Sequence, residues 1–243
     1  MPILQYGTTE IQYCCFVQRE RKDIKIAVDL VNGVVVYTPD QVGEDRLNQV
    51  LHQKAPWITR KLEELNEVKT AVAPKEFVSG EKLPYLGRQY RLKVLKEPVK
   101  RASIQLKQGR FIAEVPQTWT QNQIEETLKS KLIAWYRDHG HKKVQQRANY
   151  YQSLLGVTAQ SLQLKTQDKR WGTCTSNGDI YINWRIVMAP MHVVDYVIVH
   201  ELAHLLVPEH SEKFWQLVKS ILPEYETSKE WLRVHGMELH NIG

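Results

Sequence analysis

Two histidines and a glutamate in one short segment have the spacing of a metal-dependent hydrolase. The segment is His200-Glu201-Leu202-Ala203-His204. On an α-helix, residues four positions apart lie on one face, so His200 and His204 can direct both imidazoles at one ion. Glu201 would lie beside that ion, close enough to accept a proton from a water molecule there. The pattern predicts half of a tetrahedral zinc site together with its catalytic base.

A third histidine, His210, follows His204 after five intervening residues. Proline disfavours the helical conformation in the residue before it, so Pro208 should end the helix near Leu206 and let the chain bend back. His210 is therefore the candidate third ligand, and a fourth position is left for water, as a catalytic zinc site requires. HExxH alone arises by chance in about one chain in a hundred of this length, and the third histidine makes the combination roughly forty times rarer.

The segment around this motif is apolar on nearly every side. Its apolar residues are Val193, Val194, Tyr196, Val197, Ile198, Val199, Leu202, Ala203, Leu205 and Leu206. A helix of this composition is buried, and buried imidazoles and a buried carboxylate need partners. A shared metal ion is therefore a better interpretation than an exposed helix that carries two histidines by coincidence. The motif favours Zn²⁺, although three imidazoles bind several divalent ions.

The composition is ordinary for a soluble globular protein. The 243 residues are 42% hydrophobic and 25% charged, and they suffice for one large or two small domains. The 33 basic residues exceed the 27 acidic ones, which gives a formal net charge of +6. This excess permits a weak attraction to nucleic acid but does not demonstrate one, and plain solubility accounts for it.

The cysteines and the lack of long apolar runs indicate the compartment. Cys14 and Cys15 are adjacent and would point to opposite sides of a strand, and Cys174 makes the total odd, so no disulfide framework is expected. The N-terminal residues show no secretory leader, and no stretch approaches the length of a membrane span. We expect a cytoplasmic protein with no membrane contact. Its oligomeric state is not indicated by the sequence.

Two β-rich stretches are expected in the first half of the chain. Asn32-Gly33 is a strong turn pair and predicts a hairpin over 24–37. A helix should follow from about 45 to 69, with Pro56 starting a second helix within it, and 70–75 has the composition of a linker. The basic residues of the second stretch are interpreted as a solvated sheet face, because no aromatic residues are regularly interleaved with them. Its strands are expected at 76–78, 82–87, 88–94, 103–106 and 110–115.

The second half alternates helices with short strands. Residues 120–123 fit a capping box and start a helix that we expect to run to Gly156. Asn177-Gly178 predicts another hairpin, with 180–186 as its return strand. No internal repeat is apparent. Further helices are expected after Ser211 and over 231–234.

Further motifs accompany the histidines. They are Arg170-Trp171-Gly172-Thr173-Cys174, Asn183-Trp184-Arg185, His210-Ser211, Phe214-Trp215 and, more weakly, residues 80–88. With the HExxH segment, they resemble the YgjP-like metallopeptidase family, which groups zincin-type hydrolases related to the SprT-like and WLM groups. The resemblance is strongest over about 160–235. Val207 stands where the metzincins, which share this ligand spacing, have glycine, so we do not place the chain among them.

The resemblance implies an α+β fold with a zincin-like core, in which a backing helix and a small β-sheet precede the HExxH helix. We expect a β-rich N-terminal region over 1–118 and a zincin-like hydrolase domain over 119–243. The resemblance also implies that Glu201 is the catalytic base. The ligands of one Zn²⁺ would be His200, His204 and His210.

The expected reaction is hydrolysis by water activated at the ion, with Glu201 accepting the proton and later passing it to the leaving group. A further donor should stabilise the oxyanion of the transition state. Arg170 is the first candidate, because a guanidinium suits an oxyanion or a phosphate. Other candidates are Asn183, Tyr181 and Tyr225.

Three functions remain open. The first is a metallopeptidase whose peptide or protein substrate adds as a strand along 180–186. The second is a metal-dependent phosphohydrolase acting on nucleoside triphosphates, although the sequence has no glycine-rich phosphate loop. The third is a non-catalytic, metal-stabilised binding module. Glu201 argues against the third, because a purely structural site has no use for that carboxylate.

Overall fold

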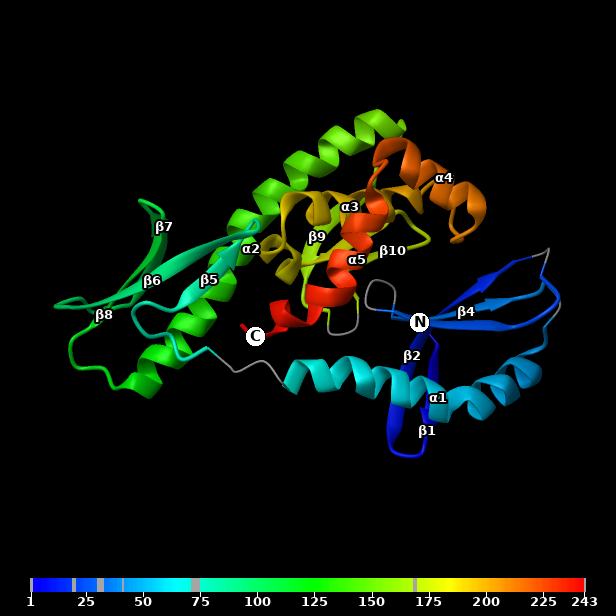
Figure 1. Cartoon of the computed structure of the whole chain (residues 1–243), viewed down its shortest axis with the longest axis horizontal. Helices are drawn as coiled ribbons and strands as arrows, with labels where there is room; N and C mark the ends of the chain where they lie inside the picture. Colours follow the sequence, from blue (N-terminus) through cyan, green and yellow to red (C-terminus); the bar gives the residue numbers. More distant parts are fainter. Residues whose placement is uncertain are drawn as a thin grey trace.

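The chain folds as an α+β protein, as expected from the sequence. The computed structural model describes residues 2–18, 21–29, 33–40, 42–70, 75–167 and 170–242, excluding the side chains of 29 and 64–70. Within these residues, three small β-sheets are combined with five α-helices (Figure 1). None of the described helices is long and apolar enough to cross a membrane.

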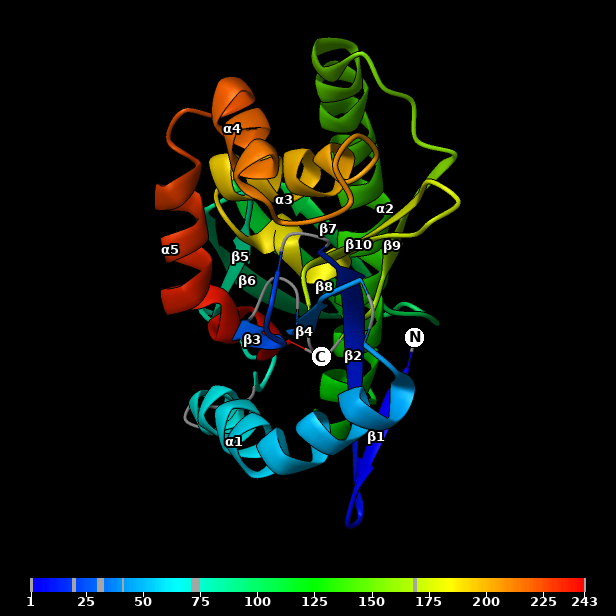
Figure 2. The same ribbon diagram turned by 90° about the vertical axis from the view of Figure 1, so that its right-hand side faces the viewer.

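The first sheet is built from the N-terminal residues and has α1 beside it (Figures 1 and 2). Its second and fourth strands in chain order are parallel, and the other neighbours are antiparallel. The hairpin predicted over 24–37 is confirmed, although its turn residues 30–32 lie outside the described part. In spatial order the strands are β1 (Ile3–Tyr6), β2 (Thr9–Val17), β4 (Gly33–Thr38) and β3 (Lys25–Asp29).

The helix α1 (Glu44–Thr70) is continuous, so the prediction of a second helix starting at Pro56 is wrong. A proline inside a helix removes one backbone hydrogen bond. Leu51, Ala55 and Ile58 lie on both sides of this proline in the sequence and are fully buried against the first sheet. Burial of this apolar face therefore outweighs the local cost of the proline.

The second sheet packs on the long helix α2 (Gln121–Leu155) (Figure 1). The strands predicted between 82 and 115 are confirmed. Its second and fourth strands are again parallel, and the other pairs are antiparallel. In spatial order the strands are β5 (Lys82–Tyr85), β6 (Arg88–Glu97), β8 (Arg110–Pro116) and β7 (Ser103–Lys107).

The strand predicted at 76–78 is not formed. Phe77 has a φ of 54°, outside the β region. The Glu81 carboxylate accepts hydrogen bonds from the backbone N–H groups of Glu76 and Phe77 at 3.3 and 2.8 Å. These contacts offer the backbone an alternative to a strand ladder and bend the chain before β5. Most of the linker predicted at 70–75 lies outside the described residues.

The two four-stranded sheets share one plan, which the sequence did not reveal. Each is ordered first, second, fourth, third strand, and each is followed by a helix. Their registers also coincide, because Ile3 pairs with Gln12 in β1–β2 as Lys82 pairs with Arg91 in β5–β6. We call 3–70 the first ββββα unit and 82–155 the second.

The helix α2 begins and ends as predicted. Thr120 and Gln123 form the capping box, and Gly156 ends the helix with a left-handed φ of 67°. Gly140 does not interrupt α2. A Cβ on Gly140 would lie 2.6 Å from Cγ1 of Val187, so glycine permits a close approach between α2 and the segment that contains Val187.

The third sheet has three strands, in the order β10 (Gly172–Cys174), β11 (Asp179–Asn183) and β9 (Ser161–Lys165). The hairpin predicted at Asn177-Gly178 is confirmed by the antiparallel pair β10–β11. The return strand is shorter than the predicted 180–186. Its last residue, Asn183, caps a 3₁₀ helix over Trp184–Met188 by accepting a hydrogen bond from the Arg185 N–H at 3.2 Å.

Three helices complete the fold. α3 ends about a turn before the predicted Leu206, and Ser211 caps α4 as predicted by accepting from the Phe214 N–H at 3.4 Å. Buried side chains from the second unit, the third sheet and these helices form one core, and the first unit has another. The domain boundary at 118 stays a prediction. The helices are α3 (Met191–Ala203), α4 (Glu212–Ile221) and α5 (Tyr225–His235), followed by a 3₁₀ helix over Gly236–His240.

Candidate metal centre

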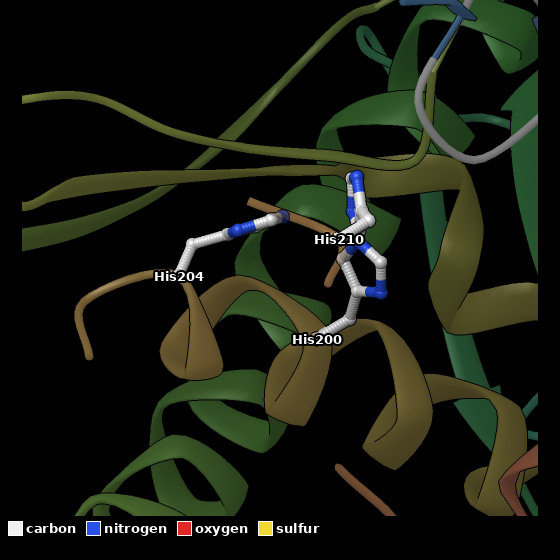
Figure 3. Close-up of side chains that lie close together, drawn as sticks. All are labelled: His200, His204 and His210. Atoms are coloured by element: carbon white, nitrogen blue, oxygen red, sulfur yellow. The ribbon is translucent and has the colours of Figure 1, made fainter. Parts of the chain in front are cut away.

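The fold brings the three predicted ligands together. One nitrogen each of His200, His204 and His210 lies within 4.8 Å of the others. The Nε2 atoms of His200 and His210 are 3.0 Å apart, and His204 points toward the same place (Figure 3). His200 comes from the last turn of α3, His204 caps its C-terminus, and His210 lies in the loop before α4. The chain turns back after α3, as predicted from Pro208, and this brings His210 to the other two histidines.

Hydrogen bonds on the outer side of two of the rings fix their orientation. Nδ1 of His204 lies 3.3 Å from the Val207 carbonyl oxygen, and Nδ1 of His210 lies 2.9 Å from the Tyr37 hydroxyl. The carbonyl can only accept, so Nδ1 of His204 carries the proton. With the same tautomer in His210, each ring donates outward and turns the Nε2 lone pair inward.

The three imidazoles are neutral at pH 7. Burial lowers the pKa of His204 to about 4 and that of His210 to about 3. Complete burial also lowers the pKa of His200 well below its usual range, and the neighbouring histidines add to this effect. Neutral rings with converging lone pairs form a donor set that fits a divalent ion such as Zn²⁺.

The motif glutamate is buried against the edge strand β10. The backbone N–H of Cys174 donates to the Glu201 carboxylate. A Cβ on Gly172 would overlap the same carboxylate, so only glycine leaves room for it. Burial raises the pKa of Glu201 to about 8, although the charge of Arg170 and the Cys174 N–H act in the opposite direction. The glycine of the Arg170–Cys174 motif thus makes space for Glu201, a role that sequence reasoning missed.

Of the candidate oxyanion donors, Arg170 lines the cavity beside Glu201. Its Nη1 donates to Sγ of Cys14 at 3.4 Å. Asn183 has another task, because its amide nitrogen donates to the carbonyls of Gln167 and Arg170 at 2.6 and 3.1 Å and supports the segment before β10.

The two tyrosine candidates also make contacts elsewhere. The ring of Tyr181 lies under the Lys165 ammonium, which is 3.2 Å from the ring centroid. Tyr225 stacks on Trp215, with ring centroids 5.4 Å apart, and donates to Glu226 at 3.4 Å. Neither tyrosine lines the cavity that contains Glu201, within the described part of the chain. The geometry therefore favours Arg170.

A cavity of about 560 Å³ opens beside the histidines. Glu201, His204 and His210 lie along it, and the β10–β11 hairpin, 172–178, forms another wall. The first sheet supplies the remaining wall from residues that sequence reasoning did not assign to the site. These are Cys14, Phe16 and Val35.

This wall follows from the alternation of strands β2 and β4. Val34 and Val36 point to α1, so Val35 and Tyr37 point the other way. Cys14 and Phe16 of β2 pair with Val35 and Tyr37 and share their face. Phe16 is the most closely involved, with its ring centroid 6.4 Å from that of His204 and 6.1 Å from that of His210. The alternation is visible in the sequence, but the partner of this face is not.

The strand predicted to receive a peptide is not available. β11 lies in the middle of its sheet, paired with β10 and β9, so the prediction of strand addition along 180–186 is wrong. β10 is the edge strand beside the cavity. The Trp171 carbonyl accepts a hydrogen bond from the Asn183 N–H, and the Thr175 N–H donates to the Asp179 carbonyl. Backbone groups alternate in direction along a strand, so those of Gly172 and Cys174 face away from β11.

One family model matches most of the chain. The family model described as YgjP-like, metallopeptidase domain, matches residues 22–235. Among solved structures, the crystal structure of the metallopeptidase zymogen of Pyrococcus abyssi abylysin is similar over 38% of this chain and 92% of that chain, with 19% identity and a TM-score of 0.35. No curated protein matches the sequence.

Proposed function

The chain belongs to the YgjP-like metallopeptidase family, and we propose from its site that it is a zinc-dependent peptidase. The observation that carries the proposal is the convergence of three neutral imidazoles beside a buried glutamate, all at one cavity. We further propose that α2, the third sheet and α3 form a zincin-like core. Their order along the chain, backing helix, small sheet and motif helix, supports this arrangement.

His200, His204 and His210 would hold the ion, which when bound supplies a Lewis acid and lowers the pKa of water to about 7. The positive charge of the ion would favour the ionised form of the Glu201 carboxylate, which burial alone disfavours. Glu201 accepts the proton of the attacking water and delivers it to the leaving amine. The Cys174 N–H and the space at Gly172 keep the carboxylate in place for both transfers. Arg170 donates to the developing oxyanion.

A peptide is the proposed substrate because an unpaired strand edge borders the cavity. An extended peptide would pair with the outward backbone groups of Gly172 and with the Cys174 carbonyl on β10, because the Cys174 N–H is bonded to Glu201. Phe16, Val35 and Leu205 make part of the cavity wall apolar. We therefore expect preference for a large apolar side chain next to the scissile bond.

A phosphohydrolase is the second candidate, because basic residues surround a neighbouring hollow. A cavity of about 240 Å³ on another side of His210 is lined by Arg21, Lys25 and Lys229. Three cations beside a metal centre would suit the phosphates of a nucleoside triphosphate. Two of them, Lys25 and Lys229, are exposed, and Arg21 is bonded to Asp23 at 2.9 Å. This cavity is therefore less preorganised for an anion than the first is for a peptide.

Replacing the glutamate separates catalysis from metal binding. We expect Glu201→Gln to keep its zinc, measured by elemental analysis, and to lose at least about a hundredfold in the rate of casein cleavage. Glu212→Gln, which removes an exposed carboxylate from the first turn of α4, is the control and should keep both properties. Full turnover of zinc-loaded Glu201→Gln would refute the mechanism. Release of phosphate from UTP with no cleavage of casein would instead establish the second candidate.

A further inference from the structure

The two ββββα units use equivalent sheet faces differently. In the first unit, the face opposite α1 covers the proposed metal centre through Phe16 and Tyr37. In the second unit, Leu92 and Phe111 point toward α2, so Arg91 and the residues beside it point away from the helix. This outer face of β5–β8 is exposed to solvent. The equivalent face is covered in the first unit and uncovered in the second.

Four cations lie side by side across this outer face. Lys82 of β5 is opposite Arg91 of β6, Arg91 is opposite Arg110 of β8, and Arg110 is opposite Lys107 of β7. All four side chains are exposed. Neighbouring strands are about 4.8 Å apart, so the row is about 14 Å long. Lys93 adds a fifth cation to the same face of β6.

The row is costly for the isolated protein. Like charges directly opposite each other on neighbouring strands destabilise a sheet. Among the described residues, no carboxylate forms an ion pair with Lys82, Arg91, Lys107 or Arg110. An external anion with several charges would offset the repulsion along the whole row at once.

We propose that this cation row binds the sugar-phosphate backbone of a nucleic acid. A line of charges matches the linear array of phosphates better than the plane of a membrane surface. The aromatic residues of the sheet are turned inward, since Tyr85 and Phe111 contact Trp135 of α2 with ring centroids 4.9 and 4.8 Å apart. Bases therefore find no stacking platform on the outer face, and the contacts are to phosphates. Duplex nucleic acid, with its bases enclosed, is the form that this surface fits.

Binding is measured best by its dependence on salt. We compare the wild type with Arg91→Gln/Arg110→Gln by fluorescence anisotropy on a short labelled duplex, between about 50 and 200 mM salt. Each phosphate contact contributes about 0.9 to the slope of log K against log salt, so the double variant should lose about 1.8 of that slope. Its affinity at the lowest salt should fall at least about tenfold.

A matched control removes two exposed cations from another surface. Lys129→Gln/Lys142→Gln changes the net charge equally on α2 and should keep the wild-type slope. Equal weakening in both double variants, or no binding by the wild type, would overturn the proposal. Binding to phosphatidylglycerol vesicles but not to the duplex would also overturn it.

The thermal stability of the variant gives a second readout without any ligand. Because Arg91→Gln/Arg110→Gln relieves repulsion, its melting temperature should equal or exceed that of the wild type at low salt. A lower melting temperature would show that the two arginines stabilise the sheet and would contradict the premise of the proposal. The inference is independent of the metal centre, so cleavage of casein by the zinc-loaded variant should be unchanged.

Discussion

At the scale of single residues, Tyr37 joins the first sheet to the proposed metal centre through His210. Its hydroxyl lies 2.9 Å from Nδ1 of His210 and accepts a hydrogen bond from the Nδ1–H of the tautomer that leaves Nε2 free to bind a metal. Groups in this position orient a ligand, and their loss usually weakens metal binding ten- to a hundredfold. We expect Tyr37→Phe to weaken Zn²⁺ binding about tenfold in a competition with a chromophoric chelator.

The control for this change lies on the neighbouring strand. Tyr13 is buried on the opposite face of the first sheet, in the cluster that contains α1. Tyr13→Phe also removes one hydroxyl from the sheet, but it should leave zinc affinity unchanged. If Tyr37→Phe bound zinc as tightly as Tyr13→Phe, the hydrogen bond to His210 would have no part in metal binding.

Gly172 is the second residue whose identity the site requires. A Cβ at this position would overlap the carboxylate of Glu201, which is held in place beside β10 by the Cys174 N–H. Gly172→Ala should therefore displace the carboxylate, slow peptide cleavage at least about a hundredfold and cost about 1–3 kcal/mol of unfolding free energy. Gly43→Ala is a suitable control, because a Cβ there meets no atom within 4 Å. Urea unfolding and a kinetic assay with zinc-loaded protein check both parts.

At the scale of elements, α2 is held to α3 by a charged contact as well as by the core. Nε and Nη2 of Arg147 donate to the two oxygens of Asp195 at 2.6 and 2.7 Å. The Asp195 side chain is 11% exposed and that of Arg147 is 31% exposed. Arg147→Ala removes the partner of the nearly buried Asp195 carboxylate. In a dry interior such a change lowers the free energy of unfolding by about 3–5 kcal/mol.

Partial exposure of the guanidinium reduces this cost. We expect Arg147→Ala to lower the free energy of unfolding by about 2 kcal/mol in urea denaturation. Arg233 makes a similar two-armed contact with Glu230 on the surface of α5, at 2.6 and 2.7 Å. Arg233→Ala should have no measurable effect, because water replaces an exposed ion pair. Equal effects of the two substitutions would contradict the assignment of Asp195 as a buried anchor of α3.

The sequence predicted elements whose signals are local. Turn pairs, the capping box at Thr120 and the spacing of the histidines depend on neighbouring residues, and the structure agrees with each of them. It did not predict features that depend on distant contacts. The end of β11 at Asn183 follows from a side-chain cap, and Phe77 is diverted by Glu81. The contact between Tyr37 and His210 needs a fold to be seen at all.

At the scale of the whole molecule, the repeated unit explains how the chain combines two surfaces. The first unit places Phe16, Val35 and Tyr37 of one sheet face on the proposed metal centre, and the second unit carries the cation row on the equivalent face. The two units carry different residues at most equivalent positions, so the repeat is visible only in the order and the register of their strands. The same plan thus serves as a wall of the cavity in one copy and as a proposed docking surface in the other.

Because Tyr37 of the first unit contacts the proposed ligand His210, zinc should stabilise that unit as well as α3. At a zinc concentration about a hundred times the dissociation constant, binding adds about 2.7 kcal/mol to the free energy of any unfolding step that releases the ion. We expect zinc to slow amide hydrogen exchange in β4 (Gly33–Thr38) and in α3, measured by mass spectrometry. In Tyr37→Phe the slowing should persist in α3 and be lost in β4, since only the link to His210 is removed. Equal slowing of β4 in both proteins would mean that packing of Phe16 on the histidines is sufficient to couple the sheet to the ion.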